Sequence, residues 1–402
     1  MRAIPRNVAA LWVGAVVVTL VATACSRLAD PTQPASPGGS TGYKPPPTPP
    51  TPPSPPPPAP PAVSGPSDAL YSAADVTCAA KQVQASRNPW KSAFTQLAAL
   101  AGPQRAHVAS PVADYNVPGI YIDPAGFWAA VNGITGDADA AYELSVMYSM
   151  TGDTSYAKPA AGILRAWATT NTMVEGHDGQ LSMAEVGAGF VLSAELLAQY
   201  PGWTAGDQAT FEGWVRNVYY PLAAVQIRDR TNNWGDWGIF ASVLAHQYLN
   251  QKAGLDSETT RLQSHIDFQI ANDGSLPEEI ARGAGAEVWY TYFALDPMTA
   301  AARALHNAGE PDLLTWTSPG GHSIGAALDH LLYLTQNAGS LGLTGPRSQD
   351  PWPADLFEAM GVISGSAPWT SYAATKAPNM YVGHHYAWTF PTLQGIPAGT
   401  CP

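Results

Sequence analysis

From about residue 68 onward, apolar residues recur at helical spacing in one segment after another. Leu144, Met147 and Tyr148 share one helical face, and Gly152 ends that segment. The same spacing marks later segments at Ala160–Trp167, Met183–Leu197, Phe211–Val218, Trp237–Leu244, Leu262–Ile266, Ala284–Asn307 and Ile324–Leu332. Pro221 is expected to close the segment that ends at Val218. Because no stretch shows alternating strands at regular spacing, the pattern predicts an all-α domain.

The arrangement of these helices can also be predicted. Short connections that hold Gly, Asp, Asn or Pro favour antiparallel neighbours in a single domain over residues 68–402. Many paired helices in one domain favour an α/α toroid, with a cleft lined by loops and helix starts. A helical solenoid would give a similar pattern, so periodicity alone establishes only a large all-α domain.

The N-terminus has the features of an export signal over residues 1–24. Arg2 and Arg6 precede the apolar run Ala9–Leu20, which is too short to span a membrane comfortably. Cys25 follows the small-residue site Ala22-Thr23-Ala24, as in lipoproteins that are acylated on cysteine. Ordinary cleavage with Cys25 unmodified is the alternative. Either way we expect a periplasmic, outer-membrane-anchored or extracellular protein, whose only membrane attachment would be a lipid on Cys25.

Residues 25–67 are expected to form a disordered, proline-rich linker. Pro45–Pro61 is nearly all proline and favours an extended polyproline helix, which would reach roughly 50 Å. Beyond it, Cys78 and Cys401 flank the globular region. Because export favours disulfides, we expect these two residues to pair.

Charge narrows the classes of partner. The formal net charge is −12 and no basic stripe is present, which argues against nucleic acid. An acidic polysaccharide would need a locally positive cleft, and the available cations are Arg216, Arg228, Arg230 and Arg282. The 13 Trp residues suit either a helical core or a sugar-binding groove. We expect a monomer.

Two segments contain groups that can bind a carboxylate. Asn232-Asn233 stands where a helix is expected to begin, and one Asn is enough to cap it. The other amide, Asn233, is then available to a substrate. Arg282 follows Glu278 and Glu279, so its guanidinium either pairs with them or binds a carboxylate in a planar, bidentate manner.

The segment after Arg282 contains two phenols, Tyr290 and Tyr292. Either side chain can pack in a helical core, or it can move a proton if a nearby arginine stabilises its anion. His177 lies in a polar loop and is a further candidate for the cleft. The pair His384-His385 lacks a third ligand at useful spacing, and the sequence holds no HExxH, GxSxG, CxxC or phosphate-loop motif. We therefore expect neither a metal nor a cofactor.

Taken together, these segments resemble the alginate lyase family of polysaccharide lyases. The Asn-Asn pair, the "E..RG" pattern at Glu279–Gly283 and the "Y...YAL" pattern aligned on Tyr290–Leu295 carry the resemblance, which covers roughly Asp137 to Asp312. It implies a toroid that cleaves a 4-O-linked uronate polymer by β-elimination. Asn233 and Arg282 would neutralise the carboxylate, and Tyr290 would act as base and acid. The residues expected to contact substrate are Trp234, Trp237, Tyr292 and His177.

One departure and two other function classes remain open. The family has His directly after the Asn pair, where this chain has Trp234, so alginate, glucuronan and other polyuronides all stay possible substrates. A glycoside hydrolase on the same toroid would need two carboxylates, with Asp236 and Glu279 as candidates. A non-catalytic glycan-binding lipoprotein would use its Trp residues to stack on sugars.

Overall fold

The computed structural model describes residues 68–283, 285–383 and 386–394. All of the described residues belong to the second of two units of the chain, residues 63–402. The predicted signal peptide, Cys25, the proline-rich linker, His384-His385 and Cys401 lie outside the described residues. No helix in the described ranges is long and apolar enough to cross a membrane.

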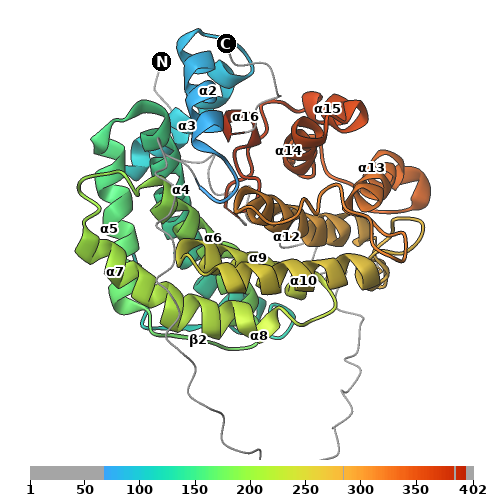
Figure 1. Cartoon of the computed structure of the whole chain (residues 1–402), viewed down its shortest axis with the longest axis horizontal. Coiled ribbons are helices and arrows are strands. Elements are labelled where there is room, and N and C mark those ends of the chain that lie inside the picture. Colours follow the sequence, from blue (N-terminus) through green and yellow to red (C-terminus); the bar gives the residue numbers. More distant parts are fainter. Residues whose placement is uncertain (1–67, 284, 384–385, 395–402) are drawn as a thin grey trace, which may run out of the picture. The chain divides into compact units, whose positions relative to one another are not determined.

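Helices buried on every side form the centre of the second unit. They are α4 (Pro124–Thr151), α6 (Gly179–Leu196), α9 (Asn233–Tyr248) and α12 (Glu287–Asn307). Each contains a long run of consecutive buried residues, such as Gly235–His246 in α9, and a helix that is apolar all round belongs in a core. In space α4 packs on α6, α6 on α9 and α9 on α12, so they follow one another around a curve (Figure 1).

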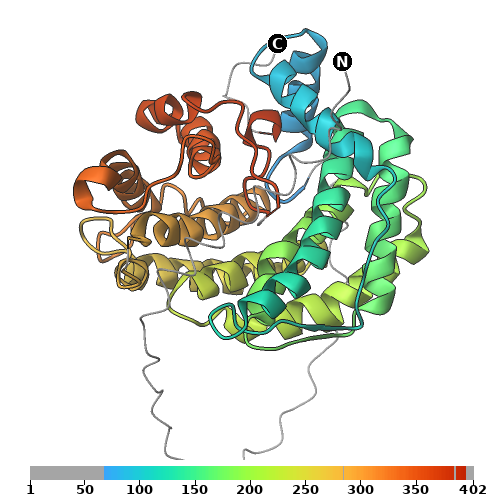
Figure 2. The same cartoon turned by 180° about the vertical axis from the view of Figure 1, so that it is seen from behind.

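A second set of helices covers this central layer and is buried on one face only. In α10 (Lys252–Gln269), Leu255, Leu262 and Ile266 lie on the buried face. The other covering helices are α5 (Thr154–Thr170), α7 (Ala205–Trp214), α8 (Val225–Ile227) and α13 (Ile324–Leu341). Figure 2 shows the same two layers from behind. Central and covering helices alternate along the chain, which confirms the predicted α/α toroid.

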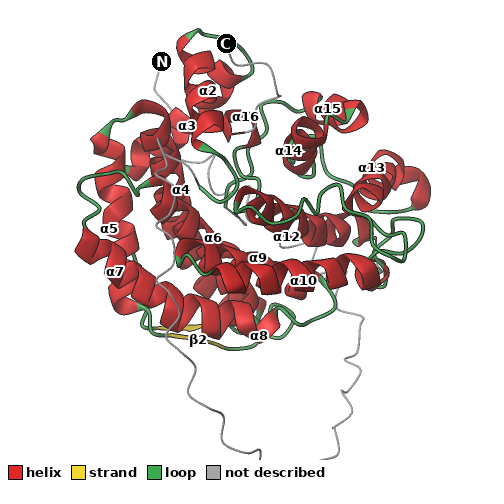
Figure 3. Ribbon diagram, viewed as in Figure 1, coloured by secondary structure: helices red, strands yellow, loops and turns green. Residues whose placement is uncertain are grey.

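Further helices complete the second unit (Figure 3). They are α2 (Ala73–Gln84), α3 (Trp90–Gln104), α11 (Pro277–Ile280), α14 (Ala354–Ser364), α15 (Ala367–Ala374) and α16 (Pro391–Gln394). Helix α16 packs against α2 and α3, so the first and last described helices are neighbours. Cys78 is buried in α2 and is disulfide-bonded. Its partner lies outside the described residues, so the pairing with Cys401 stays a prediction.

The expectation that Pro221 ends a helix is wrong. Helix α7 continues into the π-helical segment η1 (Val215–Ala224), which contains Pro221 and leads into α8. Proline lacks the backbone N–H and its ring clashes with the preceding turn of an α-helix. The local π-helical geometry changes the hydrogen-bond spacing, so the chain passes through Pro221 without stopping.

A pair of short strands was not predicted from the sequence. Strands β1 (Asp114–Asn116) and β2 (Met173–Glu175) run parallel, with Tyr115 opposite Val174. Parallel strands place the loops that follow them at the same end. Gly176 makes the second turn possible, because its φ is +87° and a Cβ there would lie 2.3 Å from the carbonyl oxygen of Val117. The segments after Asn116 and Glu175 are therefore held side by side.

Candidate active site

The Asn-Asn pair begins α9, and its two side chains have different partners. Asn232 Oδ1 accepts a hydrogen bond from the backbone N–H of Trp234 at 3.2 Å, so Asn232 is the helix cap. Asn233 is buried, and its backbone N–H and its Nδ2 each donate to one oxygen of Glu279, both at 2.7 Å. The prediction that a single Asn caps the helix is confirmed. The Nδ2 of Asn233 is held by a carboxylate from the next segment of the motif, and Asn233 is only 1% exposed, so the expectation that its amide is available to a substrate is not met in this structure.

Glu279 holds this part of the site together. It lies in α11 with no exposed surface, and its Oε2 is 3.6 Å from Nε of Arg282. Burial raises the pKa of Glu279, while the hydrogen bonds from Asn233 and the charge of Arg282 act in the opposite direction. The side chain of Arg282 keeps 31% of its surface exposed. Glu279 thus orients an amide and a guanidinium, and one of its partners can still reach a ligand.

Tyr290 lies on the other side of Arg282, in the first turn of α12. The guanidinium carbon of Arg282 is 5.0 Å from the centre of the Tyr290 ring. Asn233, Arg282 and Tyr290 are thus linked through Glu279 and Arg282, and that the three line one cleft stays a prediction. A cation over the ring stabilises negative charge on the phenol, which is what a tyrosine needs in order to accept a proton.

Sequence reasoning missed Tyr121, which reaches the same phenol. It lies in the loop between β1 and α4, and its hydroxyl oxygen is 2.5 Å from that of Tyr290. Tyr121 is 55% exposed and stands two residues after Gly119. No motif marks this residue. An exposed aromatic in a Pro-Gly loop was the available signal, and only the pairing of β1 with β2 shows where that loop lies.

His177 lies in the neighbouring loop, after β2. Its Nδ1 is 2.6 Å from Oδ1 of Asp178, and its side chain is 62% exposed. Oδ2 of Asp178 accepts a hydrogen bond of 2.8 Å from the backbone N–H of Ile120, next to Tyr121. A Cβ on Gly119 would lie 3.0 Å from the imidazole. His177 is therefore beside the loop that carries Tyr121, and a role in substrate contact stays a prediction.

Trp234 completes the boundary of the site, together with an arginine from the preceding turn. The guanidinium carbon of Arg230 is 4.0 Å from the centre of the Trp234 ring, and the charge of Asp178 acts on the same arginine. Hydrogen bonds, an ion pair and ring contacts link Asn233, Glu279, Arg282, Tyr290 and Tyr121, while Asp178 acts on Arg230 through its charge. Phenols, an amide and guanidinium groups thus lie on neighbouring segments of the fold, and they are the kinds of group that a reaction on an acidic sugar needs.

The family assignment follows from a match that spans most of the globular region. The alginate lyase family model matches residues 79–341. The chain belongs to the alginate lyase family. It is therefore a polysaccharide lyase, and the match extends well beyond the Asp137–Asp312 region in which the motifs were found. No curated protein matches the chain.

Solved structures of alginate lyases share the fold. An alginate lyase from Bacteroides ovatus is 18% identical with a TM-score of 0.65, and the alignment covers 78% of this chain and 96% of that one. Alginate lyase A1-III from Sphingomonas species A1 is 16% identical with a TM-score of 0.65, covering 83% and 97%. A variant of alginate lyase A1-III complexed with a tetrasaccharide is 17% identical with a TM-score of 0.66, covering 84% and 98%.

For this alginate lyase family member, the structure corrects part of the predicted contact set. Trp237 and Tyr292 have no exposed surface, so neither can touch a sugar. Trp237 packs on Phe293 with ring centres 5.5 Å apart, and Tyr292 donates a hydrogen bond of 2.8 Å to Oδ2 of Asp355. Both expectations failed because a motif places a residue on a helix but does not say which face is buried.

The hydrolase alternative is not supported by its own candidate residues. Asp236 and Glu279 are both fully buried. Asp236 accepts a hydrogen bond from Gln269 Nε2 at 2.8 Å and lies 3.2 Å from His265 Nδ1. Glu279 accepts hydrogen bonds from Asn233. A hydrolase needs two carboxyl groups that face the scissile bond. Within the described residues, no group of three or more His, Cys, Asp or Glu is placed to hold a metal ion.

Proposed function

We propose that this lyase cleaves alginate or a closely related 4-O-linked polyuronide, with Arg282 and Tyr290 as its reacting groups and Asn233 as a buried amide that supports them. The observation that carries the proposal is that one buried carboxylate, Glu279, binds both Asn233 and Arg282, while Arg282 lies over the ring of Tyr290. The solved structures that share the fold are named alginate lyases, which supports alginate as the first substrate to test.

The reaction assigns each group a separate task. Arg282, whose side chain is partly exposed, binds the carboxylate at C6 and offsets the charge that develops when the neighbouring C5–H bond breaks, while Asn233 stays bound to Glu279 beside it. The anion of Tyr290 takes the C5 proton. The electron pair of that bond forms the C4=C5 double bond as the C4–O4 bond breaks, and the proton passes from Tyr290 to the leaving O4. No oxidant or reductant takes part.

Tyr121 supports the same step through its hydroxyl group. A phenol that donates to the Tyr290 oxygen at 2.5 Å stabilises the Tyr290 anion before the proton is taken. With Trp234 directly after the Asn pair, no imidazole stands at that position. The base is therefore a tyrosine with two stabilising partners, Arg282 and Tyr121.

A substrate panel tests the proposal. Purified protein is incubated with polymannuronate, polyguluronate and glucuronan, and the ultraviolet absorbance of the C4=C5 double bond is followed. Growth of absorbance that is lost in Tyr290→Phe supports the proposed chemistry. New reducing ends without absorbance indicate hydrolysis, and binding without either product indicates a glycan-binding protein. Both results contradict the proposal.

The proposal extends to where the enzyme works. We expect export by residues 1–24, acylation of Cys25, and a monomeric globular region carried on the proline-rich linker. Cell fractionation of wild type and Cys25→Ser tests the anchor. Wild type found wholly in the soluble fraction contradicts acylation, and light scattering of the purified protein tests the monomer.

A further inference from the structure

Trp234, the residue directly after the Asn pair, has the side chain of an arginine packed on its ring. Trp234 is half-buried, and its ring lies 4.0 Å from the guanidinium carbon of Arg230. Contact with an indole face holds a guanidinium by cation–π attraction and leaves its N–H groups directed outward. Trp234 therefore acts as a platform for a positive charge at the edge of the site.

Two glycines in α9 bring Arg230 to this position. A Cβ on Gly235 would lie 1.9 Å from the carbonyl oxygen of Arg230, and one on Gly238 would lie 2.5 Å from the backbone nitrogen of Arg228. Neither contact is possible for a residue with a side chain. The turn that precedes α9 can therefore rest directly on the helix, which places Arg230 over the ring of Trp234.

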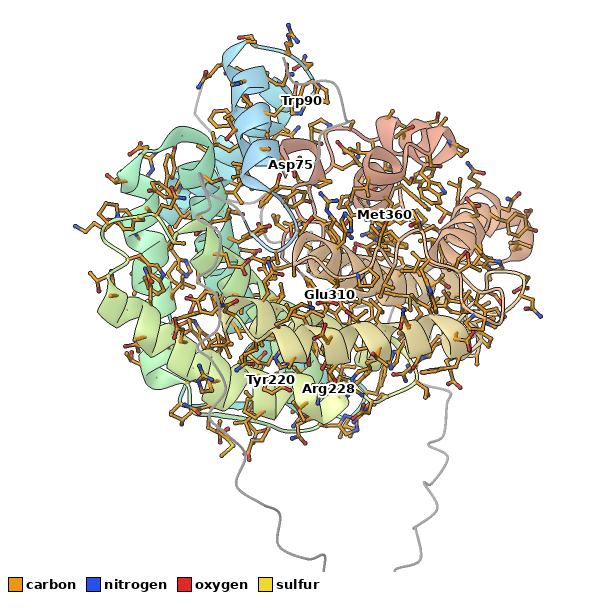
Figure 4. The ribbon with its side chains drawn as sticks, in the orientation of Figure 1. Asp75, Trp90, Tyr220, Arg228, Glu310 and Met360 are labelled. Atoms are coloured by element: carbon orange, nitrogen blue, oxygen red, sulfur yellow. The ribbon has the colours of Figure 1, made fainter. Side chains whose placement is uncertain are left out.

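Arg230 differs from the nearby arginine of the same turn. Arg228 donates to Glu258 Oε1 at 2.6 Å and to Tyr220 Oη at 3.0 Å, and Figure 4 shows Arg228 beside Tyr220. Arg230 is exposed, and it makes no ion pair with any carboxylate of the described residues. Its charge is thus available to a ligand in a way that the charge of Arg228 is not.

The one carboxylate that acts on Arg230 is already engaged. Asp178 attracts Arg230, while partial burial lowers the pKa of the arginine. Both oxygens of Asp178 have partners, since Oδ1 is 2.6 Å from His177 and Oδ2 accepts from Ile120. Arginine stays protonated at any working pH even when its pKa falls, so Arg230 provides a permanent positive charge.

We propose that Arg230, held by Trp234, binds a second uronate carboxylate of the polymer chain and so selects acidic substrates. The inference rests on the proposed lyase function. Arg282 binds the carboxylate of the sugar that loses its proton, whereas Arg230 lies over the ring of Trp234, the residue after Asn233. A polyuronide carries one carboxylate on each sugar, so a chain that crosses the site presents a second one. A histidine in place of Trp234 would lose its charge near neutral pH, whereas the Arg230–Trp234 pair does not.

Arg230→Gln provides the direct test, with Arg216→Gln as the matched control because Arg216 is exposed on η1. In lyase assays we expect Arg230→Gln to raise KM for the polyuronide about 10-fold or more, with kcat changed less than about 3-fold, because a lost ion pair with ground-state substrate weakens binding uniformly. KM should also depend less on salt in this variant. Arg216→Gln should match wild type.

Changes at Trp234 separate the charge from its platform. Trp234→Leu keeps Arg230 but removes the aromatic face, so we expect a smaller rise in KM. In the double variant Arg230→Gln/Trp234→His, the new imidazole should restore binding at pH 5.5 and lose it at pH 8, as a histidine titrates near 6.5. Thermal melting of each variant shows whether it is folded before its kinetics are compared.

Each outcome decides the inference. An unchanged KM in folded Arg230→Gln, or a fall in kcat with KM unchanged, overturns it. If the wild-type protein cleaves no polyuronide, the proposed lyase function is wrong, but the role of Arg230 can still be tested. Calorimetry then measures how tightly each variant binds an oligouronate. Weaker binding by Arg230→Gln than by Arg216→Gln supports the inference, and equal binding overturns it.

Discussion

The hydroxyl oxygens of Tyr121 and Tyr290 lie 2.5 Å apart, although the residues belong to the loop after β1 and the first turn of α12. A contact this short between two phenols favours a strong hydrogen bond, and it becomes stronger when one partner is an anion. Tyr121 and Arg282 thus approach Tyr290 from different elements. The pair joins a segment outside the recognised motifs to the proposed base.

The first prediction separates the two phenols. Tyr290→Phe keeps the ring and removes the group that moves the proton, so we expect kcat to fall by about 10³-fold or more. Tyr121→Phe removes only a stabilising donor and should cost about 10-fold to 100-fold in kcat. Steady-state kinetics on the best polyuronide measure both values. Full activity in Tyr290→Phe, or an equal loss in both variants, would contradict the assignment.

A second prediction concerns the phenol in the same segment. Tyr292 is fully buried and donates to Asp355, so Tyr292→Phe leaves that carboxylate with one donor fewer. We expect a loss of stability of about 1–3 kcal/mol in urea unfolding. Activity per folded molecule should stay near wild type. The exposed His177 offers the comparison, since His177→Ala should change stability little and activity far less than Tyr290→Phe. A catalytic defect in folded Tyr292→Phe would contradict this prediction and show that Tyr292 takes part in the reaction.

Glu279→Gln provides the third prediction. The backbone N–H and Nδ2 of Asn233 both donate to Glu279, and a glutamine would turn one acceptor into an NH2 group that faces a donor. We expect about 1–3 kcal/mol of lost stability and a fall in kcat of about 10²-fold, since Asn233 and Arg282 lose their common anchor. Glu278→Gln is the control, because Glu278 is the exposed neighbour in α11. Normal kcat in Glu279→Gln would show that Asn233 needs no such positioning.

The sequence predicted the fold and the core of the site because both depend on local patterns. Helical spacing locates α4, α5, α6, α9 and α13, and Gly152 ends α4 with φ at +70°. Within the site, the Asn232 cap on Trp234 and the Glu279–Arg282 ion pair join residues two and three positions apart. Such features can be read within a few residues of chain.

What the sequence missed depends on contacts between distant segments. Tyr121 meets Tyr290 only because β1 pairs with β2, and strands of three residues each carry almost no pattern of their own. The burial of Trp237 and Tyr292 follows from α9 and α12 being central helices, covered on every side. Periodicity distinguishes faces on amphipathic helices such as α10, but it cannot do so where a helix is buried all round.

The fourth prediction concerns the cysteines. Cys78 is disulfide-bonded, and the chain has only three cysteines, so we expect the bond to join Cys78 to Cys401. In Cys25→Ser, alkylation of the denatured, unreduced protein should label no cysteine, and tryptic mapping should recover a peptide that links the two. Reduction should lower Tm, since closing a very long loop contributes up to about 4 kcal/mol. Labelling of both thiols before reduction would exclude the pairing.

Buried carboxyl groups in the central layer make the stability of the fold depend on pH. Burial raises the pKa of Asp139 to about 6 and that of Glu143 to about 8. Asp139 keeps donors from Tyr386 at 2.7 Å and Gly383 at 2.9 Å, whereas Oε2 of Glu143 is buried without a hydrogen-bond partner. Each group binds its proton more tightly in the folded protein than in the unfolded chain. The stability they contribute is complete below the unfolded pKa near 4 and is lost as pH rises through the folded pKa.

Glu143→Gln provides the last prediction, because an uncharged side chain of the same shape removes one titrating proton from α4. We expect wild type to lose stability between about pH 5 and pH 8, with each such group contributing up to about 1.4 kcal/mol per pH unit. The slope should be smaller in Glu143→Gln, which should therefore be more stable than wild type at pH 8 and nearly equal to it at pH 4.5. Urea unfolding at several pH values measures this, with Glu212→Gln as the control because Glu212 is exposed on α7. Identical slopes in wild type and Glu143→Gln would mean that Glu143 is ionised in the folded protein, and its charge would then need a partner that α4 and its neighbours do not provide among the described residues.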